Sequence, residues 1–345
     1  MTAQLDDRIP SKWLHRAIWL ALCLIWPLIW VGSLVTTYAA GMSVPDWPNT
    51  YGYNLFLYPW KSWVTGPFDL FIEHGHRLLG AAVGFAAIGV VILAWVTERR
   101  RWVLGLSVAG LLMVIVQGVL GGIRVVEADR VLAMTHGSTA PLVFSLFTVL
   151  VVVTGRWWFE QGLLAGTLPQ GAADQMAAAT VPPRLPSLVP CITVILLTYM
   201  QMVLGAQLRH VSPGATPSAF MHTATTHLAL GFLVWGAFAV LAFQTMKCGE
   251  KSLSRPVDLL LILVLLQITL GLSTWFVKYG LPLVIDKNWA ANYLLTAKPF
   301  WGSVIVCSHV ATGSFILACA VWFGAKLWRL RHVRRQRTGA AAPSS

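Results

Sequence analysis

Charged residues, and acidic ones above all, are scarce in this chain. They make up 11% of its 345 residues, and Asp and Glu together number 13. Hydrophobic residues reach 57%, and the mean hydropathy is +0.68. A soluble globular domain usually carries about 25% charged residues. The composition therefore excludes a soluble domain and indicates an all-α integral membrane protein that crosses the bilayer several times.

Cysteine is also rare, and its five copies show no spacing typical of a disulfide framework or a zinc site. We expect these cysteines to be small buried apolar residues. They are Cys23, Cys191, Cys248, Cys307 and Cys319.

Paired aspartates are absent from the apolar segments. A polyprenyl transferase binds magnesium diphosphate through such pairs, so the sequence argues against that class of enzyme. The aspartates are isolated in or near loops: Asp46, Asp69, Asp129, Asp174, Asp258 and Asp286.

Basic residues are in excess, and the formal net charge is +12. Most Lys and Arg residues fall in the N-terminal segment, in alternate loops and in the C-terminal tail. By the positive-inside rule, we expect a multi-pass protein of the cell (inner or plasma) membrane with both termini cytoplasmic. Topology and contact with anionic membrane lipid account for this charge, so we expect no nucleic-acid partner.

Eight apolar runs are long enough to cross the hydrocarbon core. The basic start of the chain leads directly into the first run, so we expect a retained helix and no cleaved signal. The predicted spans are residues 17–39, 71–96, 102–123, 131–154, 188–208, 219–244, 257–277 and 299–325.

A segment rich in Gly, Ala and Pro, "GTLPQGAADQMAAATVPPRLP" (166–186), divides these spans into two sets of four. We predict an N-terminal half (1–155), a flexible cytoplasmic linker (156–187), a C-terminal half (188–325) and a basic cytoplasmic tail (326–345). The short echoes "QGVLGG" (117–122), "QMVLGA" (201–206) and "QITLGL" (267–272) favour two pseudo-repeated four-helix bundles. Close helix approach at small residues is the alternative explanation of these glycines.

Four histidines lie at similar depths, about 8 to 15 Å from the outer ends of the even-numbered spans. They are His76, His136, His227 and His309. Ionisable side chains in a membrane usually face a bundle interior and mark a functional site. Imidazoles from neighbouring helices can bind a heme iron from both faces, so the pattern favours one heme site in each half. Interhelical packing or hydrogen bonding is the alternative for any single histidine.

The segment "FIEHGHRLLGA" (71–81) brings charged side chains to the start of the second span. Glu73 lies about 60° from His76 around the helix and shares its face, whereas His74 lies about 160° away. Arg77 is a candidate to neutralise a heme propionate, and Glu73 is a carboxylate directed at the ring edge or at water. Alternatively, Glu73 and Arg77 form an ion pair that lets both enter the membrane.

These motifs resemble those of the heme A synthase family. "EHGHRLLGA" is similar to its Glu-x-x-His-Arg motif, and "GMSVPDWPNTYG" (41–52) is similar to the Pro-Asp-Trp-Pro loop that follows its first helix. "QGVLGGIRV" before His136 and "QMVLGAQLRH" before His227 also look like family motifs. The resemblance covers about residues 17–325.

The resemblance implies a membrane oxidoreductase that converts the C8 methyl group of heme O to a formyl group by successive hydroxylations. By position, His76 and His136 match the ligands of the substrate heme O, and His227 and His309 match those of a heme B cofactor. Glu73 matches the catalytic carboxylate, which would orient water or stabilise positive charge at the methyl carbon. The implied partners are the farnesyltransferase that supplies heme O, the terminal oxidase under assembly, and an electron acceptor that the sequence does not identify.

The chain departs from the family pattern at two places. Many members carry a cysteine pair in the outer loops, but residues 40–70 and 209–218 contain none. Leu228 follows His227 where many members have Arg. No role is predicted for His74, His210 or His222; His222 lies about 140° from His227, so both cannot face one iron.

Two other functions stay open. A b-type cytochrome with paired histidine ligands, relaying electrons between quinol and a partner, would use the same four histidines. A transporter with a histidine proton relay would bind no heme. Replacement of Glu73 by Gln separates a synthase from a relay, because only the synthase needs the carboxylate.

Overall fold

The computed structural model describes residues 11–166, 184–212, 214–279 and 300–340. These residues form helices and loops without an extended strand, and eight of their helices are long and apolar enough to cross a membrane, as the sequence predicts. The eight are α1 (Lys12–Thr37), α3 (Phe68–Thr97), α4 (Arg101–Val126), α5 (Arg130–Thr154), α8 (Leu188–Arg209), α9 (Pro217–Cys248), α10 (Lys251–Tyr279) and α11 (Phe300–Ala340).

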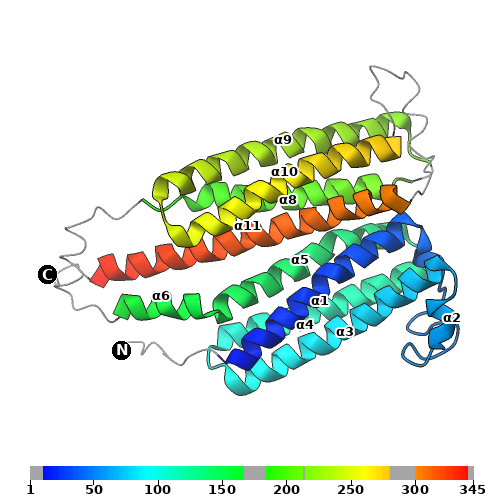
Figure 1. The fold of residues 1–345 in the computed structure, drawn as a ribbon, viewed down its shortest axis with the longest axis horizontal. Helices are drawn as coiled ribbons and strands as arrows, with labels where there is room; N and C mark the ends of the chain where they lie inside the picture. Colours follow the sequence, from blue (N-terminus) through cyan, green and yellow to red (C-terminus); the bar gives the residue numbers. More distant parts are fainter. Residues whose placement is uncertain (1–10, 167–183, 213, 280–299, 341–345) are drawn as a thin grey trace.

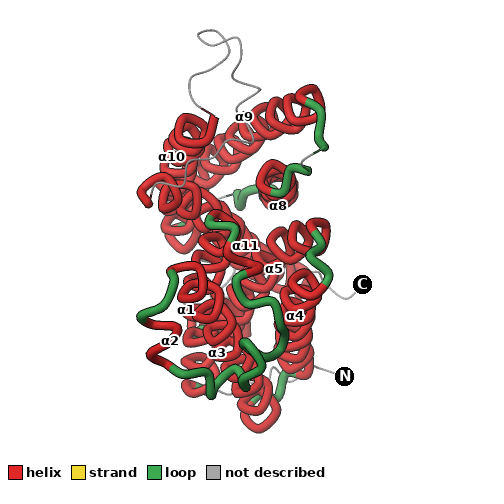
Figure 2. The backbone as a smooth tube through the Cα atoms, turned by 90° about the vertical axis from the view of Figure 1, so that its right-hand side faces the viewer, coloured by secondary structure: helices red, strands yellow, loops and turns green. Residues whose placement is uncertain are grey.

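The eight helices form two four-helix bundles that lie side by side (Figure 1). In the first bundle α1 packs against α3 and α5, and α4 closes the ring by packing against the same two helices. In the second bundle α8 packs against α9 and α11, and α10 packs against the same pair. The two bundles meet where α11 packs against α1 and α5, as the end-on view of Figure 2 shows. The even-numbered predicted spans are α3, α5, α9 and α11. In the first bundle α3 therefore lies diagonally opposite α5, and in the second α9 lies diagonally opposite α11.

Each bundle has a main apolar core toward one end, and smaller apolar clusters lie at the other end. In the first bundle the largest fully buried side chains include Phe144, Phe147 and Ile18, and in the second they include Leu260 and Phe323. Because lipid is as apolar as these side chains, close packing and polar contacts between helices stabilise such bundles. Four helices begin at the opposite end, where the short helix α2 (Trp60–Val64) also lies: α3, α5, α9 and α11.

The segment predicted as a flexible linker begins with a helix, α6 (Arg156–Gly166). Its tryptophans pack against neighbouring helices: Trp158 is 6% exposed and stacks on Trp328 of α11 with ring centres 5.9 Å apart. Arg329 lies over the ring of Trp158 and donates to its backbone carbonyl. Aromatic and cation–π contacts thus stabilise a helix at the start of the segment predicted as a linker. Residues 167–183 of the linker lie outside the described residues.

The last helix extends beyond the predicted span. α11 continues from Phe300 to Ala340, whereas the predicted span ends at residue 325. Within this extension Leu327, Leu330 and Val333 are buried, so apolar contacts carry the helix into the region predicted as a basic tail.

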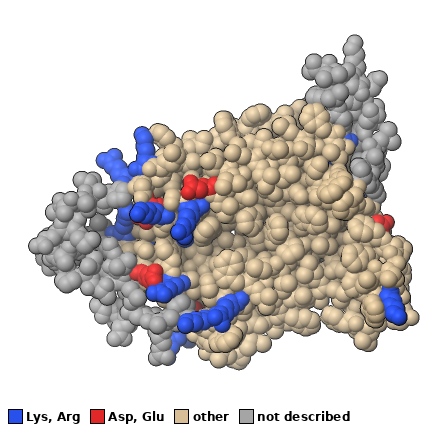
Figure 3. All heavy atoms as spheres, viewed as in Figure 1, with Lys and Arg blue, Asp and Glu red and all other residues tan. Residues whose placement is uncertain are grey.

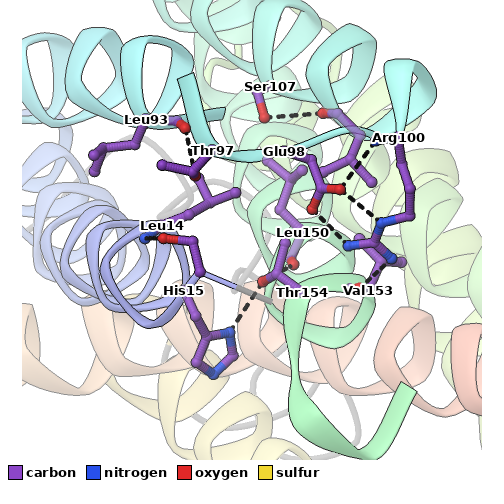
Figure 4. Close-up of polar contacts among 12 residues, drawn as sticks. Leu14, His15, Leu93, Thr97, Glu98, Arg100, Ser107, Leu150, Val153 and Thr154 are labelled. Atoms are coloured by element: carbon purple, nitrogen blue, oxygen red, sulfur yellow. Dashed lines mark hydrogen bonds and ion pairs between the residues drawn. The ribbon is translucent and has the colours of Figure 1, made fainter. Parts of the chain in front are cut away.

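The turn between α3 and α4 is anchored to the end of α5 (Figure 4). Arg100 forms an ion pair with Glu98 at 2.7 Å and donates to the carbonyl of Val153 at 3.0 Å. His15 of α1 contacts the hydroxyl of Thr154 at 3.0 Å. These bonds join α1, α3, α4 and α5 at the end distant from α2.

On the face shown in Figure 3, Lys and Arg side chains gather where α1 begins and α11 ends. The middle of this face is almost free of charged side chains. Such a band suits contact with lipid tails, which agrees with a multi-pass membrane protein.

Candidate functional site

The four predicted histidines meet as two pairs, one in each bundle. The rings of His76 (α3) and His136 (α5) have centres 6.4 Å apart and planes at 90°. The rings of His227 (α9) and His309 (α11) have centres 6.5 Å apart and planes at 72°. Each pair comes from diagonally opposite helices, so its side chains meet inside the bundle.

The other diagonal of each bundle contributes a glycine beside each ring. Gly32 of α1 lies against His76, and Gly121 of α4 lies against His136. Gly205 of α8 and Gly271 of α10 lie in the same way against His227 and His309. A Cβ atom added at any of these four glycines would come closest to the ring carbon Cε1 of its histidine. The glycines thus leave room for imidazoles at the bundle centre.

Each ring lies near a backbone carbonyl of the glycine-bearing helix, but among the described residues only His136 forms a hydrogen bond with that carbonyl through Nδ1. His136 Nδ1 lies 3.1 Å from the carbonyl oxygen of Gln117. The other three rings interact with the equivalent carbonyls, those of Leu28, Gln201 and Gln267, but without a hydrogen bond of standard geometry to any described residue. A proton on Nδ1 leaves the Nε2 lone pair free for a metal.

The donor set fits a heme iron. Among the described residues, no group of three or more His, Cys, Asp or Glu side chains is placed to bind a metal ion. A heme iron requires only two protein ligands, because the porphyrin supplies the rest. With metal–imidazole bonds of about 2 Å on opposite sides of one ion, the ring centres would lie roughly 6 Å apart. Both observed pairs match that separation.

Glu73 is a buried carboxylate beside the first pair. It is 1% exposed, and its Oε1 accepts from Arg77 Nε at 3.0 Å. Its Oε2 lies 3.9 Å from Arg124 of α4 and has no hydrogen-bond partner among the described residues. The ion pair that the sequence left as an alternative therefore forms, and one carboxylate oxygen stays available for another partner.

Arg77 also anchors the loop between α1 and α3. Its NH1 donates to the carbonyls of Asp46 and Asn49, and its NH2 donates to the carbonyl of Val44. With the bond to Glu73, four of the five N–H groups of this guanidinium have protein partners. Arg77 therefore joins the loop between α1 and α3 to the carboxylate.

The Pro-Asp-Trp-Pro motif shapes this loop through side-chain contacts. Asp46 accepts from the backbone N–H groups of Tyr51 and Gly52, both at 2.8 Å. Burial alone would raise the pKa of Asp46, but these two hydrogen bonds lower it below its usual range. Trp47 packs directly against Gly122, the neighbour of Gly121. The loop thus lies over the end of the bundle that contains His76 and His136.

The three histidines without a predicted role have different surroundings. His74 is 1% exposed, contacts the hydroxyl of Thr50 at 3.0 Å, and packs against Tyr58 and Trp63. It therefore stabilises the segment between α1 and α3, a role that the sequence did not predict. His222 is exposed on α9.

His210 follows the last residue of α8. Burial, together with the positive charges of Arg209, Arg124, Arg130 and Lys278, lowers its pKa to about 4.

Two parts of the site escaped prediction. Arg124 follows Gly121 by three residues, and the sequence gives it no role in the site. Its side chain is only 14% exposed, and Gly41 makes room for its guanidinium. The sequence around Gly32 does not match the motif of the other three helices, because Leu28 occupies the position that is Gln in each of them. A search for glycine at the depth of the histidines would have found it.

The fold and the two pairs define a class: helical membrane proteins with two sites suited to a heme bound by paired histidines. Within that class, the chain belongs to the family of cytochrome oxidase assembly proteins, whose sequence model matches residues 15–298. The match includes Glu73, His76, His136 and His227 and ends before His309.

The chain is also similar to a curated protein, the heme A synthase of Methylobacterium radiotolerans. The two are 26% identical over an alignment of 248 residues, and the match covers 65% of this chain. The chain spans 65% of the length of that relative.

Proposed function

We propose that this protein is a heme A synthase, which oxidises the C8 methyl group of heme O to a formyl group by successive hydroxylations. The observation that carries the proposal is the buried carboxylate of Glu73 beside one of two imidazole pairs. Membership of the cytochrome oxidase assembly family and the name of the similar relative support it.

In this proposal His76 and His136 hold heme O, the substrate, and His227 and His309 hold heme B, the cofactor. Heme B, when bound, would supply one-electron redox chemistry. The contact of Nδ1 with the carbonyl of Gln117 orients the imidazole of His136 and leaves its Nε2 for the iron.

Glu73 acts on the substrate side. It precedes His76 by one helical turn on the same face of α3, so its carboxylate lies near the edge of a ring bound by His76. Its free Oε2 can orient a water molecule or stabilise positive charge at the methyl carbon as it is oxidised. The ion pair with Arg77 fixes the direction of the carboxylate.

Two arginines are placed to neutralise propionates. Arg77 has one N–H group beyond its four protein bonds, and the buried Nε of Arg124 has no partner among the described residues. An arginine and a propionate form a strong charge-assisted pair away from water. Both residues therefore belong to the proposed substrate site.

The proposed topology follows from the basic end in Figure 3, which would face the cytoplasm with both termini. The imidazole pairs then lie near the outer surface of the cell membrane. The enzyme would receive heme O from its farnesyltransferase and deliver the product to terminal oxidase assembly.

Expression with a heme O source, followed by extraction, chromatography and mass measurement of the hemes, tests the proposal. Formyl heme is expected from the wild type. Glu73→Gln should keep the heme content and lose the product. A cytochrome that only relays electrons would show no formyl heme in either protein and unchanged electron transfer in the variant.

A further inference from the structure

The four glycines beside the histidines share one arrangement, which we call the glycine seat. A seat consists of a glycine and the backbone carbonyl of the residue four positions before it. The four seats are Leu28 with Gly32, Gln117 with Gly121, Gln201 with Gly205, and Gln267 with Gly271. The same backbone surface therefore contacts an imidazole on four different helices, two in each bundle.

Helix geometry explains why glycine is needed in a seat. A helical side chain covers the turn that precedes its own Cα, including the carbonyl four residues earlier. Glycine leaves that carbonyl open, and its oxygen can accept a second hydrogen bond beside the one within the helix. The ring can then lie flat on the helix with Nδ1 toward the carbonyl.

The distances show how little room an added methyl group would have. A Cβ on Gly32 would lie 2.8 Å from Cε1 of His76, and on Gly121 or Gly271 it would lie 3.1 Å from Cε1 of His136 or His309. On Gly205 the distance to His227 would be 3.3 Å. Alanine would thus displace the ring most at Gly32 and least at Gly205.

In three of the four seats the residue that supplies the carbonyl is glutamine, and its side chain contacts the helix that carries the histidine. Gln117 donates to the hydroxyl of Thr139 at 2.6 Å, and Gln201 donates to the carbonyl of His227 at 2.8 Å. The amide of Gln267 lies against Gly313, one turn after His309. These contacts fix the spacing between the glycine helix and the histidine helix.

We propose that Gly32, Gly121, Gly205 and Gly271 are positioning residues that set the electron-donating strength of the imidazole ligands by exposing a backbone carbonyl to Nδ1. The inference rests on the proposed binding of heme by these histidines. A hydrogen bond from Nδ1 to a carbonyl fixes the tautomer and makes the imidazole a stronger electron donor. A stronger donor favours the ferric ion over the ferrous ion, so the seats lower the reduction potential.

The second bundle offers the test, because heme B can be supplied to the purified full-length protein. Gly271→Ala should raise the midpoint potential of the bound heme and change its low-spin electron paramagnetic resonance g values. Gly205→Ala should do the same to a smaller extent. Gly236→Ala on α9 is the matched control, since a Cβ there meets nothing within 4 Å, and it should match the wild type.

Several outcomes decide the question. The inference is overturned if Gly271→Ala and Gly205→Ala both keep the potential and g values of the wild type. It is also overturned if both variants unfold while Gly236→Ala folds, because the glycines would then serve helix packing alone. Loss of heme from variants with wild-type helical content supports it. A wild type without low-spin heme would instead reject the proposed heme site.

Discussion

The Nε atom of Arg77 lies 3.0 Å from Oε1 of Glu73, one turn earlier on α3, while the rest of the same guanidinium binds the carbonyls of Val44, Asp46 and Asn49. One side chain therefore connects the loop between α1 and α3 to the proposed catalytic carboxylate. The loop and the site are parts of one polar network.

Arg77→Gln should separate the loop from the carboxylate. A misplacement of about 1 Å at a reacting group can lower a rate about 10²-fold, so we expect a loss of that order in formyl heme production. Heme content should change little, because His76 and His136 remain. Arg130→Gln is the control, because Arg130 donates to the carbonyl of Val211 in another loop. Equal production by both variants would contradict the positioning role.

Gly122→Ala should displace the loop between α1 and α3. The ring of Trp47 packs directly on Gly122, so a methyl group forces it away. Overpacking of this kind costs about 1 to 3 kcal/mol, and we expect a lower thermal unfolding midpoint in detergent. Gly118→Ala on the same helix should leave the midpoint unchanged, because a Cβ there meets nothing within 4 Å. Matching midpoints for the two variants would show that the loop contact contributes nothing to stability.

Arg209→Gln should weaken the contact between the bundles. Arg209 of α8 donates to the hydroxyl and carbonyl of Ser33 and to the hydroxyl of Thr37, all at 2.9 Å. Hydrogen bonds to a charged group contribute about 1.5 to 3 kcal/mol each when buried. The midpoint should fall clearly, whereas Arg156→Gln, which removes an exposed ion pair with Glu160, should change it little. A smaller effect from Arg209→Gln than from Arg156→Gln would contradict this assignment.

His210 should make stability depend on pH. Its pKa falls from 6.5 to about 4 in the folded protein, so between these values the unfolded chain binds a proton that the folded chain does not. Stability then rises with pH across that window. Unfolding midpoints measured from pH 4 to 6.5 should rise less steeply in His210→Gln than in the wild type. Parallel curves would show that His210 is not responsible.

The spans and the four histidines could be predicted because hydropathy and depth depend on position along one helix. The pairing of His76 with His136 followed from depth and alternation alone. Arg124, by contrast, reaches Glu73 only because α3 packs beside α4, and no pattern within either helix encodes that contact. The same holds for Gly32, whose importance depends on the ring of His76 across the helix interface.

The loop and α6 were harder to predict for a related reason. Asp46 and Thr50 fold the loop through side-chain contacts with Gly52 and His74, which are specific pairings without periodicity. The helical start of the linker depends on Trp158 stacking on Trp328, 170 residues further along the chain. The echoes between the two halves match the glycine seats, while duplication of the halves stays a prediction.

The most direct test of the account is electron paramagnetic resonance of the ferric heme B complex of the full-length protein. We predict a low-spin signal of two imidazole ligands in the wild type and in His222→Ala, whose histidine is exposed on the same helix as His227. His227→Ala and His309→Ala should each convert the signal to high spin. A low-spin signal that survives both of these substitutions would contradict the paired ligation on which the proposed function depends.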